Sequence, residues 1–222
     1  MTDAVTWSFS RMKSFETCPK QYYHTQVLGE FPKQDTVATI YGSEFHKACE
    51  NYIGQGTELP LQFSFAKSAL DALGSKPGAK YCELKLGLTE TLEPCGFFDD
   101  AVWFRGIVDL LIINGNTAWV VDYKTGKSAK YADPGQLELM ALCVFKHYPE
   151  VQRVHGGLLF VVAGAFVKRR YTAEEESDLW ASWLSRYARL RKAHATGVWN
   201  PNPSGLCRAH CPVVSCPHNG AG

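Results

Sequence analysis

Two aspartates and one lysine interrupt apolar segments near the middle of the sequence. Asp109 follows an Ile-Val pair, and Asp122 and Lys124 flank a tyrosine after two valines. Charged groups inside an apolar sheet need a reason, because burying a charge costs free energy. Two carboxylates aimed at one point repel each other unless a cation or a proton lies between them. Oxygen ligands favour Mg²⁺ or Mn²⁺ over zinc, and such an ion can polarise a phosphodiester and activate a bound water. The pattern predicts metal-dependent phosphodiester hydrolysis, with the Lys124 ammonium orienting the nucleophile or stabilising the phosphorane.

The geometry that brings these residues together depends on one turn. Asn114-Gly115 is typical of a two-residue β-hairpin loop. Pairing outward from that loop places Asp109 opposite Val120 and makes it the diagonal neighbour of Asp122, about 7–8 Å away at the backbone. Asp122 and Lys124 share a face, because side chains alternate along a strand. A three-residue loop would turn one strand over and separate the carboxylates.

Alternating helical and strand patterns surround this hairpin. We expect helices over 8–16, from Gly42, over 62–73, from Asp133 to about 147, and from 172 to about 195, where Thr172 and Glu175 form a capping box. We expect strands over 82–88, 101–113, 117–123, 154–162 and 165–171. The first strand carries Glu83 on its polar face, where it could add a metal ligand or hold a water. We predict a single α/β domain over 1–222, with a helical part to 80, a catalytic sheet and helix over 81–171, a long helix over 172–195, and a cysteine-rich clasp over 196–222.

The overall composition fits a folded protein with an ample core. Of the 222 residues, 45% are hydrophobic and 20% are charged, and 23 basic against 22 acidic residues give a net charge of +1. This balance does not exclude a DNA enzyme, because a local basic groove suffices to grip nucleic acid. The sequence contains no apolar stretch long enough to cross a bilayer, and Met1–Trp7 lacks the features of a secretory signal. We therefore expect a cytoplasmic protein that does not contact membranes.

The cysteines near the C-terminus indicate a second metal centre. A reducing compartment disfavours structural disulfides, and Cys207, Cys211 and Cys216 are spaced closely enough to bind a metal. Three thiols leave a tetrahedral site one ligand short, and Cys18 supplies the fourth if the chain ends meet. Two histidines lie among the thiols, so zinc bound by three cysteines and one histidine is an alternative.

The sequence resembles the RecB-type PD-(D/E)XK nucleases, which include CRISPR-associated RecB-like exonucleases and many phage-encoded relatives. The resemblance extends over most of the chain and rests on these matches: Gly106–Asp109, Val120–Lys127, Cys18–Tyr23, Gly42–His46, Gln136-Leu137, and Glu83 at the acidic position before the hairpin. Many relatives have a tyrosine four positions after the glutamine, where this chain has Met140.

The resemblance implies a restriction-endonuclease-like fold, a mixed sheet flanked by helices, and a role for each matched residue. His46, Asp109 and Asp122 would ligate Mg²⁺ or Mn²⁺ together with the backbone carbonyl of Tyr123, and Lys124 would be catalytic. Cys18, Cys207, Cys211 and Cys216 would hold an iron–sulfur cluster, expected to be [4Fe–4S]. Gln136 would contact DNA, although its spacing from Asp133 also fits a capping box.

Basic residues that could contact DNA phosphates are concentrated in two places. Lys168–Arg170 form one group, and the helix expected over 172–195 carries the other, so Arg169, Arg186 and Arg189 are candidates for DNA binding. A run of this kind ordinarily marks a solvated face. We predict a DNA exonuclease that acts on single-stranded ends in recombination, replication or repair. A structure-specific or nicking endonuclease and a non-catalytic DNA-binding module are the alternatives, and the sequence identifies no protein partner.

Overall fold

The computed structural model describes residues 4–32, 34–130 and 132–220, and the chain divides into two compact units. One unit is Asp35–Trp180, and the other combines Met1–Gln34 with Ala181–Gly222. The residues of each expected metal centre, the carboxylate site and the cysteine site, all lie within a single unit. The expectation of one nuclease domain over 1–222 stays a prediction.

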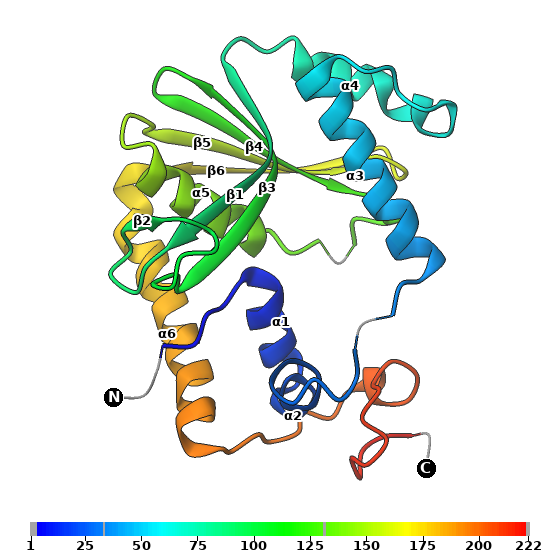
Figure 1. The fold of residues 1–222 in the computed structure, drawn as a ribbon, viewed down its shortest axis with the longest axis vertical. Coiled ribbons are helices and arrows are strands. Elements are labelled where there is room, and N and C mark those ends of the chain that lie inside the picture. The colour runs from blue at the N-terminus through cyan, green and yellow to red at the C-terminus, as the bar shows by residue number, and fades with distance from the viewer. Residues whose placement is uncertain (1–3, 33, 131, 221–222) are drawn as a thin grey trace. The chain divides into compact units, whose positions relative to one another are not determined.

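The unit Asp35–Trp180 is built on a mixed sheet of six strands (Figure 1). The spatial order is β2-β1-β3-β4-β5-β6, with bounds β1 (Ala79–Leu88), β2 (Pro94–Cys95), β3 (Phe104–Asn114), β4 (Thr117–Lys124), β5 (Arg153–Phe160) and β6 (Ala165–Thr172). Neighbouring strands are antiparallel except β4 and β5, which are parallel. A parallel pair needs a long crossover connection, and helix α5 (Gly135–His147) lies within it. The predicted class, a mixed sheet flanked by helices, is confirmed.

Helices cover both faces of this sheet. On one face, α3 (Val37–Gln55) and α4 (Lys67–Gly74), which follows a 3₁₀ segment over Leu61–Ala66, enclose a core with residues of β3 and β4. On the other face, α5 approaches Gly156 through Leu137. Helix α3 begins before the expected Gly42, because Thr36 caps it in a capping box with Thr39. The short strand β2 was not predicted.

The β3–β4 hairpin differs from the predicted one by its loop. Asn114 pairs with Thr117, so the two loop residues are Gly115 and Asn116 rather than Asn114 and Gly115. Gly115 has φ +57 and Asn116 does not have a positive φ, as in a type II′ turn with glycine first. The predicted pairing of Asp109 with Val120 is therefore wrong, since Val120 pairs with Leu111.

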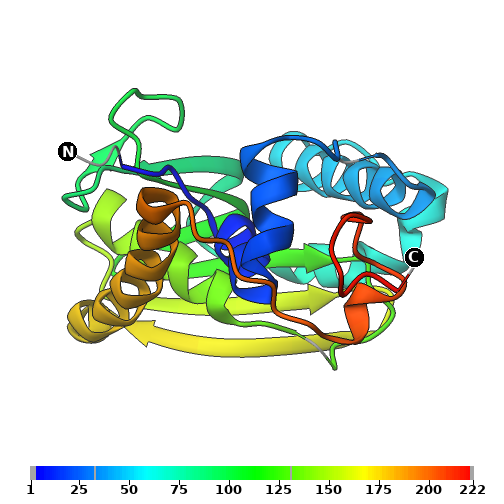
Figure 2. The same ribbon diagram turned by 90° about the horizontal axis from the view of Figure 1, so that it is seen from below.

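The other unit contains α1 (Phe9–Thr17), α2 (Pro19–Tyr22), a π-helical turn over Tyr23–Val27, and the part of α6 (Glu176–Thr196) from Ala181 onward. Ser8 caps α1 by accepting the Arg11 N–H, at the start of the helix expected over 8–16. The predicted capping box of Thr172 and Glu175 is confirmed, at a 3₁₀ turn over Ala173–Glu175 that leads into α6. Figures 1 and 2 both draw the C-terminal segment beside the N-terminal helices, and residues of both segments line one pocket.

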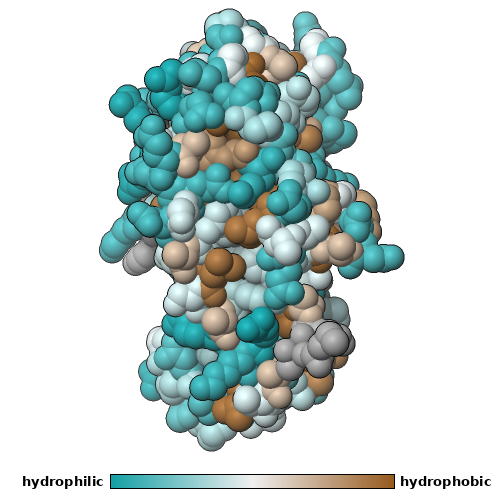
Figure 3. Space-filling view, turned by 90° about the vertical axis from the view of Figure 1, so that its left-hand side faces the viewer, coloured by the Kyte–Doolittle hydropathy of each residue, from teal (hydrophilic) through white to brown (hydrophobic). Residues whose placement is uncertain are grey.

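Apolar and hydrophilic residues are mixed on the visible surface. On the face drawn in Figure 3, apolar residues are scattered among hydrophilic ones. None of the helices in the described part of the chain is both long and apolar enough to span a bilayer.

Candidate functional site

Three carboxylates occupy one line across β1, β3 and β4. The register of β1 and β3 places Glu83 opposite Asp109, and the register of β3 and β4, continued by one position, places Asp109 opposite Asp122. Asp109 is 8% exposed and Asp122 is 5% exposed, and they are the charged side chains buried in the core of the described residues. Glu83 has φ +50, a left-handed conformation that is uncommon outside glycine. Regular strand geometry is therefore interrupted at this line.

Helix α3 adds His46 to two of these carboxylates. Its Nδ1 lies 3.3 Å from Asp109 Oδ2 and 3.6 Å from Glu83 Oε1. One ligand atom from each of the three residues lies within 4.8 Å of the others. On its other side, His46 Nε2 lies 3.1 Å from the backbone carbonyl oxygen of Tyr123. His46, Asp109 and the Tyr123 carbonyl, three of the four expected metal ligands, thus lie together. Glu83 belongs to the same cluster. The sequence had suggested it as an added metal ligand or as a group that binds a water.

The contacts of His46 define its protonation. A carbonyl oxygen only accepts, so Nε2 carries a hydrogen and donates to Tyr123. Nδ1 faces two carboxylates, which favours a second proton there. Burial disfavours the imidazolium, but hydrogen bonds to Asp109 and Glu83 outweigh it and raise the pKa of His46 to about 10. The imidazolium therefore adds a positive charge among the carboxylates.

Asp122 is held by two further side chains. Its Oδ2 lies 2.6 Å from Lys124 Nζ, and its Oδ1 accepts a 2.5 Å hydrogen bond from Gln136 Nε2. Lys124 donates to Gln136 Oε1 at 3.1 Å, which closes a ring of three contacts. Burial first, and then the charge of Asp109, raises the pKa of Asp122, while Lys124 opposes the rise. The Gln136 side chain thus belongs to this site, and its predicted contact with DNA stays a prediction.

The donors of this cluster fit a hard divalent cation. Carboxylate and carbonyl oxygens are the ligands that Mg²⁺ and Mn²⁺ prefer, and the sheet buries two carboxylates at one place. Asp109 Oδ2 also accepts the Tyr123 N–H at 2.7 Å, which ties the two strands together beside the Tyr123 carbonyl. The arrangement offers both the negative charge and the fixed oxygens that such an ion needs.

Met140, four positions after Gln136, has a packing role. It is buried, and a Cβ added to Gly106 would lie 2.4 Å from its Cε. Its side chain thus fills the space that the missing side chain of Gly106 leaves on β3. The glycine of the matched Gly106–Asp109 motif and the unusual methionine are therefore complementary.

The arginines expected to contact DNA have partners within the protein. Arg186 forms two hydrogen bonds to Glu16, at 2.8 and 2.6 Å, and lies 3.7 Å from the Trp183 ring. Arg189 also contacts Glu16, at 3.0 Å. Arg169 is exposed on β6 and donates to the Lys168 carbonyl. Arg186 would have to leave its ion pair to reach a phosphate, so the DNA contacts of these arginines stay predictions.

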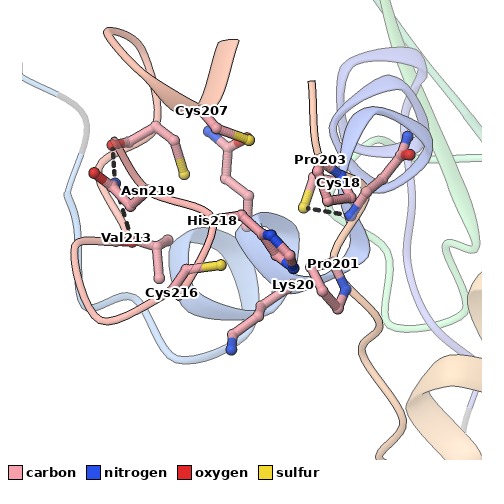
Figure 4. Close-up of a pocket in the computed structure, with 12 residues that line it drawn as sticks. Cys18, Lys20, Pro201, Pro203, Cys207, Val213, Cys216, His218 and Asn219 are labelled. Carbon is pink, nitrogen blue, oxygen red and sulfur yellow. Dashed lines mark hydrogen bonds between the residues drawn. The ribbon is translucent and has the colours of Figure 1, made fainter. Parts of the chain in front are cut away.

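The four cysteines of the expected cluster line one pocket in the unit that combines both chain ends (Figure 4). The Asn202 N–H donates to Cys18 Sγ and the Ser204 N–H donates to Cys207 Sγ, both at 3.4 Å. Among the described residues, no three thiols have sulfur atoms within 4.8 Å of one another. Zinc–sulfur bonds of about 2.3 Å in a tetrahedral site would require closer sulfurs than that. His218 also lines the pocket.

Comparisons with known proteins bear on the family and the fold of the chain. A model of the PD-(D/E)XK nuclease superfamily matches residues 6–217. The chain is similar in structure to a candidate exonuclease of Eubacterium rectale, with a TM-score of 0.55 and 12% identity over 91% of this chain and 85% of that one. It is also similar to SSO0001, with a TM-score of 0.50 and 13% identity over 99% of this chain and 89% of that one. A search of curated proteins gives no significant match. The resemblance seen in the sequence and the expected restriction-endonuclease-like class are confirmed.

Proposed function

The chain belongs to the PD-(D/E)XK nuclease superfamily, and we propose that it is a divalent-metal-dependent deoxyribonuclease that digests DNA from single-stranded ends. The observation that carries this proposal is the line of Glu83, Asp109 and Asp122, whose two aspartates are buried, with His46 on one side and Lys124 on the other. A binding module would not need a lysine held against a buried aspartate beside two further carboxylates. A role in DNA recombination, replication or repair is part of the proposal.

Each side chain of the site has a part in this chemistry. His46, Asp109, Asp122 and the Tyr123 carbonyl would hold Mg²⁺ or Mn²⁺, with Glu83 as a further ligand or as the group that binds a water. The bound ion would polarise the phosphodiester and lower the pKa of its water. Gln136 holds Lys124 and Asp122 in fixed positions, so the ammonium lies where it can orient the nucleophile or stabilise negative charge on the phosphate.

Substitutions within the site test the metal-dependent chemistry. Asp109→Asn and Asp122→Asn each remove a charged ligand, and we expect activity to fall roughly a hundredfold or more while the fold persists. Lys124→Ala should lower turnover more than metal affinity. Glu150→Gln serves as the control, since it changes an exposed charge in the turn after α5. Rates within tenfold of wild type for all three site variants would reject the assignment.

The need for a free end is tested with two single-stranded substrates. End-labelled linear DNA should be shortened in the presence of Mg²⁺ or Mn²⁺, and closed circles should stay intact. The similarity to a candidate exonuclease supports this direction. Rapid linearisation of the circles would favour the structure-specific or nicking endonuclease. No cleavage of either substrate with either metal would favour the non-catalytic DNA-binding module.

The cysteine pocket supports a second part of the proposal, an iron–sulfur cluster of [4Fe–4S] type on Cys18, Cys207, Cys211 and Cys216. The four residues line one pocket, and backbone N–H groups donate to two of the sulfurs. Hydrogen bonds of this kind stabilise thiolates and tune cluster potentials. Zinc is the alternative, with His218 available as a ligand.

Metal analysis of anaerobically purified protein separates these two cofactors. A cluster predicts brown protein that contains iron and sulfide, and Cys18→Ala should lose both. Cys95→Ala is the matched control, because Cys95 is a partly buried thiol of β2 in the other unit. Colourless protein with one equivalent of zinc would reject the cluster and keep the metal site.

A further inference from the structure

A strip of aromatic and basic side chains crosses β4, β5 and β6. It consists of Trp119, His155, Phe166, Lys168 and Arg170, together with Lys76 from the segment between α4 and β1. The register aligns Trp119, His155 and Arg170 in one row, and it aligns Gly157 with Lys168 in the next row that faces the same way. Phe166 follows in a third row. We refer to these six residues as the basic–aromatic strip.

Side-chain alternation places the strip on one face of the sheet. Trp119 and Leu159 pack against the core beneath α3, and Leu159 pairs with Phe166. A Cβ added to Gly157 would lie 2.2 Å from the Phe166 ring, so this ring covers the glycine. Gly156 instead approaches α5. Since Arg169 pairs with Gly156, it belongs to the opposite face, whereas Lys168 and Arg170 belong to the strip.

The contacts within the strip join flat rings to cations. Trp119 and His155 are stacked, with ring centroids 5.7 Å apart and planes 21° apart. Lys76 Nζ lies 4.9 Å from the Trp119 ring, and Lys168 Nζ lies 5.1 Å from the Phe166 ring. Burial, followed by the charges of Arg170, Lys76 and Arg153, lowers the pKa of His155. The strip is thus a strongly positive surface that still presents uncharged rings.

Two features leave this surface open to a ligand. Phe166 is 44% exposed, and Lys168 and Arg170 are exposed as well. Within the part of the chain that the structure describes, none of the three basic residues of the strip forms an ion pair with a carboxylate. Strand β6 is the outermost strand of the sheet (Figure 2). The positive charge is therefore not neutralised within the protein.

The strip begins beside the candidate metal centre. The row that contains Phe166 continues through Leu159 to Tyr123, whose carbonyl oxygen contacts His46. On that face, Tyr123 and Val121 are buried in the core beneath α3, and Asp122 and Lys124 point to the other face, toward Gln136 of α5. A DNA strand would therefore pass from the metal centre round the end of the sheet to Phe166, and from there along β6 to Lys168 and Arg170.

We propose that the basic–aromatic strip binds the single strand of DNA next to the scissile phosphate, with bases stacked on its rings and phosphates held by its cations. This inference rests on the proposed nuclease function and deepens it. Base stacking on aromatic rings tolerates any sequence, which suits an enzyme that must pass along DNA. In a duplex the bases are stacked on each other and cannot offer their faces to Phe166.

The simpler explanation is protection of the sheet edge. Charged residues on an edge strand prevent it from pairing with other chains, and Lys168–Arg170 could serve that purpose alone. If these charges only protect the edge, Arg169 has the same role as Lys168 and Arg170, and the aromatic ring of Phe166 has none. The proposal instead separates Arg169 from Lys168 and Arg170 and gives Phe166 a part in binding.

Equilibrium binding distinguishes the two explanations. Fluorescence anisotropy with a labelled thymidine oligonucleotide, in EDTA so that no cleavage occurs, compares Lys168→Gln/Arg170→Gln with the matched control Arg169→Gln. We expect the double variant to weaken binding at least tenfold and to lower the slope of log affinity against log salt by about 1.4, or about 0.7 per phosphate contact. The control should stay within twofold of wild type, which would also reject the prediction from the sequence that Arg169 binds DNA. Equal effects of the double variant and the control would overturn the proposal.

A second variant tests the ring without changing charge. Phe166→Leu keeps an apolar cover over Gly157 and removes the stacking face. Binding should weaken roughly fivefold to a hundredfold with an unchanged salt slope, and a matched duplex should be affected less. Unchanged single-strand affinity, or an equal loss for the duplex, would overturn the assignment to single-stranded DNA.

Cleavage of a dinucleotide with Mn²⁺ separates this inference from the proposed function. The dinucleotide is too short to extend from the metal centre to Lys168 and Arg170 on β6, two strands from β4, so the double variant should cleave it at the wild-type rate. If the double variant cleaves the dinucleotide normally and also binds the oligonucleotide as tightly as wild type, the binding role of the strip is rejected and the proposed nuclease function stands. Loss of binding in a protein that cleaves no DNA would support the strip and reject the nuclease.

Discussion

The imidazole of His46 allows a quantitative test of the metal centre, because a proton and a metal ion compete for the same place. Its pKa of about 10 means that the imidazolium predominates at pH 7. A metal can use the ring as a ligand only after Nδ1 has lost its proton. At pH 7 the protonated form of the ring exceeds the neutral form about a thousandfold, because the pKa lies about three units above that pH. Metal affinity should therefore be about a thousandfold lower at pH 7 than with a neutral ring.

Between pH 7 and 8.5 the apparent affinity for Mn²⁺ should rise about tenfold per pH unit, because the neutral fraction of His46 rises by that factor. Without bound metal, the stability of the fold depends on pH in the opposite direction. A raised histidine pKa stabilises the fold fully below the unfolded value near 6.5 and loses this contribution as the pH rises through about 10. Metal should accordingly stabilise the protein more at pH 8.5 than at pH 7.

Titration calorimetry in buffers of different ionisation enthalpy measures the affinity and the proton release together. We expect close to one proton released per Mn²⁺ bound at pH 7.5. His46→Gln removes the competing proton, so its weaker affinity should be nearly independent of pH. A wild-type affinity that does not change from pH 7 to 8.5, with no proton released, would refute the reasoning.

Three other changes test the structure around the site. Gln136→Ala should lower turnover by roughly 10- to 100-fold, because it frees both Lys124 and Asp122, and wild-type kinetics would contradict this role. Thr172→Ala should cost about 1 kcal/mol in urea unfolding by removing a cap, and an unchanged midpoint would exclude it. Gly78→Ala should destabilise by roughly 1–3 kcal/mol, because φ is +122 and the new Cβ would meet the Ile113 carbonyl at 2.2 Å. Gly74→Ala, with open space around it, is the control for thermal unfolding and should be close to neutral.

Elements with a strong local signal could be predicted from the sequence. The side chain of Ser8 caps α1, and Thr172 with Glu175 opens the segment before α6, because such caps depend only on neighbouring residues. Strands β4, β5 and β6 were found within two residues of their ends, since alternation or a continuous apolar run marks them. These features need no knowledge of the rest of the fold.

The parts of the site that depend on distant residues could not be predicted in the same way. The contact of His46 with Glu83 joins a helix to a strand whose backbone is left-handed at that residue, and no local pattern indicates such a conformation for glutamate. The sequence offered a DNA contact or a helix cap for Gln136, and its contact with Asp122 depends on how α5 packs on the sheet. The resemblance to the family pointed to His46 and Gln136, whereas their local sequence alone did not decide their roles.

The hairpin explains why the aspartates were brought together although their predicted pairing was wrong. Asn114-Gly115-Asn116 allows a loop of either the first two or the last two residues, and the structure uses the second with glycine first. The change moves every β3 residue two positions along β4. Because side chains alternate with a period of two, an even shift leaves both faces unchanged. Asp109 therefore keeps its face and moves from the diagonal of Asp122 to the position opposite it, where the two charges are closer. A shorter separation increases the repulsion that a cation must relieve, so the observed register favours metal binding more than the predicted one.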